Sequence, residues 1–146
     1  MEEKNMSLEQ SRFMMTKEAI EAEIAIINEY LGKCAWMDFT FGTSHGGLIE
    51  LFGAIDQTYN NYVDNYEIRI EFTHPHFISS LYSWTSGDIK PFIQLASATE
   101  EYRLKKKYQV EWGNYLFKIG VDGFDKPPIF IGAKTIKCII LNEKPF

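Results

Sequence analysis

Two of the three histidines stand in an His-x-His arrangement, a spacing that could bring two imidazoles to one metal ion. His74 and His76 flank Pro75 in the segment FTHPHFISSLYSW, and alternate residues of a strand point to the same face. A zinc site requires three or four ligands, however, and the remaining histidine, His45, belongs to a different loop. Pro75 also fixes its own backbone and lacks an amide hydrogen. We therefore interpret the segment as a hairpin turn between two strands, with a metal site as the alternative.

A glycine-rich loop, GTSHGG at residues 42–47, places Ser44 beside His45, the residue types of a nucleophile and its base. Adjacent side chains on an extended backbone diverge, and the G-x-S-x-G pattern of a nucleophile elbow does not occur. The loop also lacks the lysine of a phosphate-binding P-loop, and it precedes a strand-like run instead of a helix. Its composition predicts the tip of a hairpin.

Carboxylates offer a third kind of chemistry, because two acids in different environments can serve as general acid and base. Asp38 and Glu50 each interrupt an apolar run of the first predicted hairpin, and an inward-facing acid there would lie in a ligand cavity. Glu67 and Glu71 alternate with Arg69 on one strand face. A solvated ladder of charges explains that face better than a catalytic pair, so no catalytic residue is assigned.

The elements that would position these side chains begin with one amphipathic helix. Residues 1–6 are expected to form a disordered leader, and the helix is predicted to start at Ser7, in the capping box SLEQ, or at Thr16. An apolar stripe recurs beyond Thr16 at helical spacing, formed by Ile20, Ile24, Ile27 and Leu31. Gly32 suits the left-handed position that follows a helix. A single narrow stripe indicates that one face packs on another element.

After the helix the hydrophobic period changes to two, which predicts strands. The clearest alternation is YEIRIEF at residues 66–72, with apolar side chains on one face and charged ones on the other. Residues 102–112 alternate as well, although a short helix capped at residues 97–100 is an alternative for the front of that segment. The predicted strands cover residues 35–41, 48–55, 66–72, 77–84, 91–96, 102–112, 115–121 and 129–141.

These elements predict a single α+β domain over residues 1–146. One N-terminal helix would pack on a strongly twisted, mostly antiparallel sheet, or on a partly closed barrel, of about seven or eight strands. A chain of 146 residues is long enough to bury one core. Its 11 Phe, 8 Tyr and 3 Trp favour a strand-rich core, because rings are common in strands.

Charge and composition narrow the class of function. With 20 acidic and 15 basic residues the net charge is −5, which disfavours binding to the phosphate backbones of nucleic acids. The basic cluster RLKKK at residues 103–107 is interpreted as a solvated face. The N-terminus is acidic and unlike a secretory signal, and no apolar run reaches the ~20 residues that span a bilayer. We expect a cytoplasmic protein without membrane contact, in which Cys34 and Cys138 are small hydrophobes.

Tyrosines indicate where a partner would bind. The connector DQTYNNYVDN at residues 56–65 carries three candidates among polar neighbours, Tyr59, Tyr62 and Asp64. Tyr is enriched at the centre of protein interfaces. The polar face of the next strand adds three more predicted binding residues, Glu67, Arg69 and Glu71.

Two segments, YEIRIEFTHPHFISSLYSW at residues 66–84 and GNYLFKIGVDGFDKPPIFIGAKTIKCIIL at residues 113–141, carry a resemblance to known proteins. With them the chain resembles the small acidic immunity proteins that bacteria make against their own polymorphic toxins. In those families a helix precedes the strands, a strand ending in Phe precedes a Trp-bearing strand, and the last strand is rich in lysine. The resemblance implies a bacterial protein that binds and blocks a toxin and has no catalytic residue.

The leading hypothesis is a non-enzymatic binding protein, without a cofactor, that covers the basic cleft of a protein partner with an acidic, aromatic-edged surface. One alternative is a small-molecule carrier with an apolar pocket lined by Trp and Tyr. The other is a hydrolase or metal enzyme that uses His45, His74 and His76. The sequence leaves the identity of the partner and the oligomeric state open.

Overall fold

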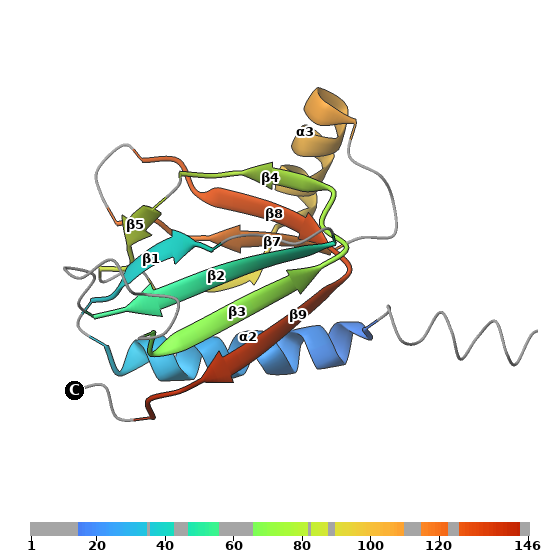
Figure 1. The fold of residues 1–146 in the computed structure, drawn as a ribbon. Helices are drawn as coiled ribbons and strands as arrows, with labels where there is room; N and C mark the ends of the chain where they lie inside the picture. The colour runs from blue at the N-terminus through green and yellow to red at the C-terminus, as the bar shows by residue number, and fades with distance from the viewer. Residues whose placement is uncertain are drawn as a thin grey trace, which may run out of the picture.

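A computed structural model describes the chain over residues 15–34, 36–42, 47–55, 66–81, 83–87, 90–109, 115–122 and 126–143. In these residues two helices and nine strands form, and the strands build two antiparallel sheets (Figure 1). The predicted α+β class with antiparallel strands is therefore confirmed.

The helices are α2 (Lys17–Gly32) and α3 (Ala98–Tyr108), and neither is long and apolar enough to cross a membrane. The five-stranded sheet contains, in spatial order, β5 (Ser83–Thr85), β1 (Asp38–Phe41), β2 (Leu48–Ala54), β3 (Ile68–Thr73) and β9 (Thr135–Ile140). The four-stranded sheet contains, in spatial order, β4 (Phe77–Ser79), β8 (Ile129–Ala133), β7 (Tyr115–Ile119) and β6 (Ile93–Leu95). The first predicted hairpin is confirmed, since β1 and β2 pair in an antiparallel register.

Helix α2 begins at the second of its two predicted starts. The Thr16 hydroxyl caps it by accepting a hydrogen bond from the Ala19 amide (3.1 Å). All four residues of the predicted apolar stripe are buried. Gly32 belongs to the last turn and Lys33 is the capping residue, so the predicted end is one residue too early. The predicted leader and the start at Ser7 lie outside the described residues.

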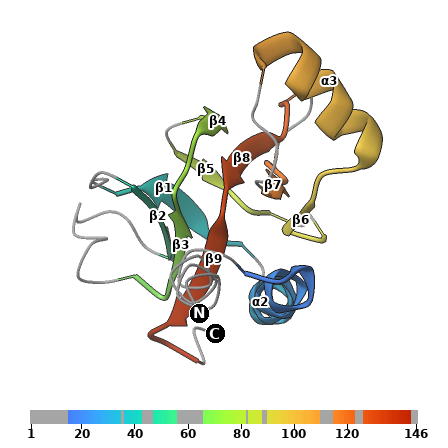
Figure 2. The same cartoon turned by 90° about the vertical axis from the view of Figure 1, so that its right-hand side faces the viewer.

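Helix α2 lies between the outer edges of the two sheets, beside β9 and β6 (Figure 2). At one edge Glu23 Oε2 accepts a hydrogen bond from the Cys138 amide of β9 (2.9 Å). At the other edge Asn28 Nδ2 donates to the Ile93 carbonyl (2.8 Å), and Asn28 Oδ1 accepts from the Ile93 amide (3.0 Å). Side chains of the helix thus supply partners that edge strands otherwise lack. The strands described here do not close into a barrel, and α2 bridges their edges instead.

The two sheets meet at a corner where two neighbouring segments change sheet together. β3 continues through His74, Pro75 and His76 into β4, and β8 continues through Lys134 into β9. Because β3 pairs with β9 and β4 pairs with β8, the segments stay side by side on both sides of the corner. The Lys134 amide donates to the Thr73 carbonyl (3.0 Å), and His74 has a positive φ of 49°. The His-x-His segment therefore turns the chain from one sheet into the other.

The division of the strands between two sheets overturns three sequence predictions. The hairpin around the histidines is wrong, because β3 and β4 lie in different sheets and do not pair with each other. The single strand predicted at residues 77–84 is two short strands, β4 and β5, in different sheets. The single strand predicted at residues 129–141 is likewise divided into β8 and β9. These divisions explain why nine strands are described where seven or eight were expected.

The strand predicted at residues 102–112 is also wrong over its first part, which belongs to helix α3. The alternative, a helix capped at residues 97–100, is confirmed by a complete capping box. Ser97 Oγ accepts a hydrogen bond from the Glu100 amide (3.1 Å), and the Glu100 carboxylate accepts one from the Ser97 amide (3.0 Å). Gln109 ends the helix in the left-handed conformation, with φ of 54°.

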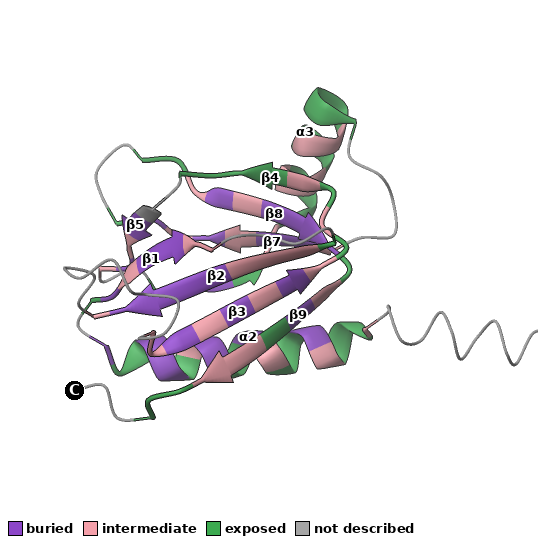
Figure 3. Cartoon of the chain, viewed as in Figure 1, coloured by how far each residue is buried: buried purple, intermediate pink, exposed green. Residues whose placement is uncertain are grey.

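The core lies between the two sheets and α2, where the inward-facing residues are buried (Figure 3). Aromatic rings from different elements fill it: Phe39 stacks on Phe92 with ring centres 4.6 Å apart, and Phe72 meets Phe117 edge-on at 5.2 Å. The alternation predicted for residues 66–72 is confirmed in β3, where buried and half-buried residues follow each other without exception.

Candidate binding surface

Five charged residues share the face of the five-stranded sheet that points away from the core. We call this set the outer face, and it consists of Asp38, Glu50, Arg69, Glu71 and Lys137. In the strand register Glu71 lies opposite Glu50 on one side and opposite Lys137 on the other. Asp38 and Glu50 are half-buried and alternate with residues of the core, so neither acid faces the interior.

The sequence-predicted binding residues that the structure describes are close together, and each has an internal partner. Arg69 Nη2 pairs with Glu71 Oε1 (3.0 Å), and its guanidinium lies 5.6 Å from the centre of the Tyr66 ring. Glu67 Oε2 accepts a hydrogen bond from the Ile55 amide (2.8 Å). These contacts give the three residues a structural role at the start of β3. The remaining predicted residues, Tyr59, Tyr62 and Asp64, lie outside the described residues, and the six-residue surface stays a prediction.

The histidines occupy an exposed position. His74 and His76 are both exposed at the corner between the sheets, whereas His45 and the neighbouring Ser44 lie outside the described residues. Where the chain is described, no group of three or more His, Cys, Asp and Glu side chains is placed to hold a metal ion. The metal-enzyme hypothesis therefore stays a prediction that rests on the His-x-His spacing.

The carrier hypothesis predicted a pocket lined by Trp and Tyr. Trp84 is instead buried in the core, where its ring stacks on Phe39 at 5.9 Å. One cleft, of about 360 Å³, opens between the end of α2 and the start of β6, and Leu31, Lys90 and Phe92 are among its lining residues. Its lining contains no Trp or Tyr, so this cleft differs from the pocket that the hypothesis requires.

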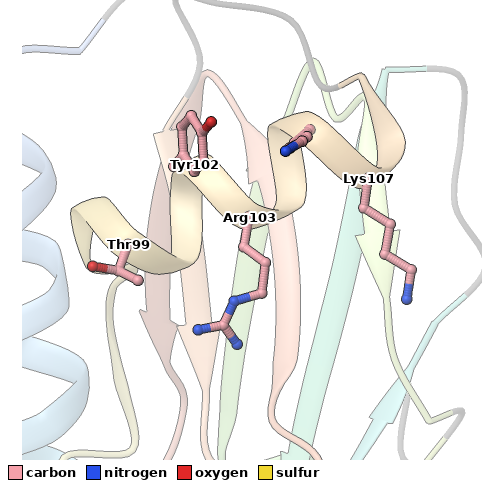
Figure 4. A pocket seen from close by; sticks show the side chains of 5 residues that line it. Thr99, Tyr102, Arg103 and Lys107 are labelled. Carbon is pink, nitrogen blue, oxygen red and sulfur yellow. The ribbon is translucent and has the colours of Figure 1, made fainter.

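Helix α3 presents an exposed surface that combines an aromatic ring with basic side chains. We call this surface the α3 face, and it is formed by Thr99, Tyr102, Arg103, Lys106 and Lys107. These residues line a shallow, open depression of about 450 Å³ (Figure 4). Tyr102 is 68% exposed, the highest value among the exposed large hydrophobic residues of the described chain. The interpretation of residues 103–107 as a solvated face holds for Arg103, Lys106 and Lys107, which are exposed, whereas Leu104 and Lys105 are half-buried.

The opposite side of α3 holds the helix to the four-stranded sheet. Glu100 Oε2 pairs with Lys118 Nζ of β7 at 2.7 Å. That contact, followed by the bond from the Ser97 amide, holds the pKa of the Glu100 carboxyl below its usual value. The ring of Tyr108 lies 5.1 Å from that of Phe77 in β4. Although α3 is anchored in this way, none of its residues is buried, and it stands out from the body of the protein (Figure 2).

Comparison with known proteins gives no family. No protein-family model matches the chain, and no curated protein or solved structure matches it either. The resemblance to immunity proteins therefore stays a prediction.

The two thiols are free, and the structure makes them poor nucleophiles. Burial, followed by the charge of Glu67, raises the pKa of Cys34 to about 11. Burial, followed by the charge of Glu23, raises the pKa of Cys138 to about 12. Burial also raises the pKa of the neighbouring Tyr30, whose hydroxyl donates to the Asn142 carbonyl. Both cysteines therefore remain protonated at neutral pH, as expected for small hydrophobes.

At pH 7.5 the native thiols are expected to react with iodoacetamide at least about a hundredfold more slowly than in the unfolded chain, since the thiolate is the reacting form. The pKa of Cys34 rises from 9.0 to about 11, which lowers its thiolate fraction accordingly. A raised thiol pKa stabilises the fold below the unfolded pKa, so stability should fall as the pH rises above about 9. Intact-mass measurement against time checks the rates. A native thiol that reacts as fast as free cysteine would contradict the burial of these groups.

Proposed function

We propose that this chain is a non-enzymatic binding protein of the immunity type, which acts by covering a surface of a protein partner. The observation that carries this proposal is α3, a capped helix of 11 residues without a single buried residue. A helix in a stable domain usually buries one apolar stripe against its neighbours. The capping box and the contacts with Lys118 and Phe77 hold α3 in place instead, and its outward side is left uncovered for contact with a partner.

The composition of the α3 face fits a contact surface. Tyr102 and Arg103 are adjacent and exposed, and Tyr and Arg are among the residue types that contribute most binding energy in protein interfaces. The anchors at Lys118 and Phe77 fix the helix relative to the sheet before a partner arrives. A surface that is ordered in advance loses less entropy on binding. Occlusion of a partner by this helix needs no chemical step.

The test replaces the exposed ring. Tyr102→Ala is expected to leave the melting temperature unchanged, because the ring is exposed and alanine favours a helix. A partner captured from the organism that encodes the chain should bind this variant at least about tenfold more weakly, as for a hot-spot tyrosine. Affinity is measured by calorimetry with the purified partner.

The matched control is Leu141→Ala, which removes another exposed apolar side chain far from α3 in the fold, 58% exposed against 68% for Tyr102. It should bind the same partner as tightly as the unchanged protein. The proposal is overturned if every captured protein binds the two variants equally, or if nothing is enriched over a control resin.

A further inference from the structure

Resting on the proposed function, we infer that the partner presents an acidic segment, rich in Asp and Glu, to the α3 face. The net charge of the whole chain is −5, so the opposite expectation, a basic partner, follows from composition alone. The structure shows a local reversal of that charge. The outward side of α3 carries Arg103, Lys106 and Lys107 and no acid.

The two acids in the first turns of α3 are already paired with lysines. Glu100 pairs with Lys118 at 2.7 Å, and Glu101 pairs with Lys105 at 3.0 Å. No carboxylate elsewhere in the described residues pairs with Arg103, Lys106 or Lys107. Among the described residues, the cations of the α3 face are therefore free to pair with carboxylates of a partner.

The spacing of these cations makes an external anion favourable. Arg103 lies three residues before Lys106 and four before Lys107, so the side chains are neighbours on one helix face. Like charges at these spacings repel each other and destabilise a helix. The negative end of the helix dipole offsets part of this repulsion for the two lysines in the last turn. It does not account for Arg103, one turn earlier. Glu100, three residues before Arg103, is engaged by Lys118, so a further carboxylate from a partner would relieve the repulsion at Arg103.

A protein segment fits this face better than a nucleic acid. The helix is only about 16 Å long, so it spans few phosphates. Helix α2 exposes Glu18, Glu21 and Glu29, and with a net charge of −5 the molecule repels a long polyanion that extends beyond α3. Tyr102 adds an apolar contact, as at the centre of a protein interface. A short acidic segment with an apolar side chain can pair with the cations of the α3 face and also pack on the Tyr102 ring.

The experiment measures fluorescence anisotropy of three labelled probes, each as long as α3 in residues or nucleotides: a peptide of Glu and Asp, the same peptide with Gln and Asn, and single-stranded DNA. The acidic peptide should bind the unchanged protein, and its affinity should fall as salt is added. Its affinity for the double variant Arg103→Gln/Lys106→Gln should be about five- to tenfold lower than for the unchanged protein. The control Lys33→Gln/Lys126→Gln removes the same charge from exposed lysines outside α3 and should bind as the unchanged protein does.

Three results overturn the inference: tighter binding of DNA than of the acidic peptide, equal binding of the acidic and neutral peptides, or no loss in Arg103→Gln/Lys106→Gln. These results are distinct from failure of the proposed function. If the captured partner is lost with Tyr102→Ala but retained with Arg103→Gln/Lys106→Gln, the chain is a binding protein and its partner is not acidic at this face.

Discussion

Replacing Asn28 with alanine is expected to lower the free energy of unfolding by about 3 kcal/mol, even though alanine is the better helix former by roughly half a kcal/mol. Asn28 bonds both the amide and the carbonyl of Ile93, at 3.0 and 2.8 Å. Without the side chain, both backbone groups of this edge strand lose their partner in a partly buried place. Urea unfolding followed by tryptophan fluorescence, to which the buried Trp84 contributes, measures the change.

The neighbouring exposed residue of α2 provides the control. Glu29→Ala should change stability by less than about 0.5 kcal/mol, as expected for an exposed site. If Asn28→Ala has an effect equally small, the contacts at β6 do not hold the helix in place, and the apolar stripe of α2 alone accounts for its docking.

With Asn28→Asp, the pH determines which of the two hydrogen bonds to Ile93 can form. An ionised carboxylate can accept from the Ile93 amide, but it repels the Ile93 carbonyl; a protonated one can donate to that carbonyl. The folded pKa of the new acid should therefore be raised above the reference value of about 3.9. Its stabilising effect is complete below the unfolded pKa and is lost as the pH rises through the folded pKa. The advantage of Asn28→Asp over Asn28→Ala should thus be largest in acid.

Local signals predicted those parts of the fold that depend on a single element. The apolar stripe of α2 and the alternation of β3 each reflect one buried face, and both are confirmed. The corner is different, because a switch of sheet depends on two segments, at residues 74–76 and at Lys134, that bend together. The sequence around Lys134 carries one weak signal of the division, because the alternation changes phase there: the core residues of β8, such as Ile131, are odd-numbered, whereas Ile136 of β9 is even-numbered.

Other failures have a different physical cause. In α3, Tyr102, Leu104 and Tyr108 fall at even positions, a spacing that is typical of a strand. The segment is a helix because the capping box at residues 97–100 starts one and the following residues favour it. Glu23 and Asn28 look like any polar residues beside an apolar stripe, and only the placement of two sheet edges gives them their partners. The α3 face was missed as a binding candidate for the same reason, because the orientation of Glu100 and Glu101 is set by Lys118 and by the helix itself.

Gly53→Ala is expected to destabilise the fold by about 2 kcal/mol, although alanine is normally favoured over glycine in a strand. An added Cβ would lie 2.7 Å from the Phe39 ring, 2.8 Å from Ile68 Cγ2 and 2.8 Å from Met37 Sδ, and all three side chains are fully buried. Gly32→Ala is the matched control: nothing lies within 4 Å of its added Cβ, and it should stabilise α2 by up to about 1 kcal/mol. Two glycine-to-alanine changes should therefore shift the urea midpoint in opposite directions.

The loss of stability in Gly53→Ala should come mainly from the clash with the Phe39 ring. Met37 has a flexible side chain that can move away, whereas Phe39 is held by Phe92 at 4.6 Å and by Trp84 at 5.9 Å. In a Phe39→Leu background the same substitution should cost about 1 kcal/mol less, which a double-mutant cycle measures directly. Equal costs in both backgrounds would locate the conflict at Ile68 instead, in the strand on the other side of β2.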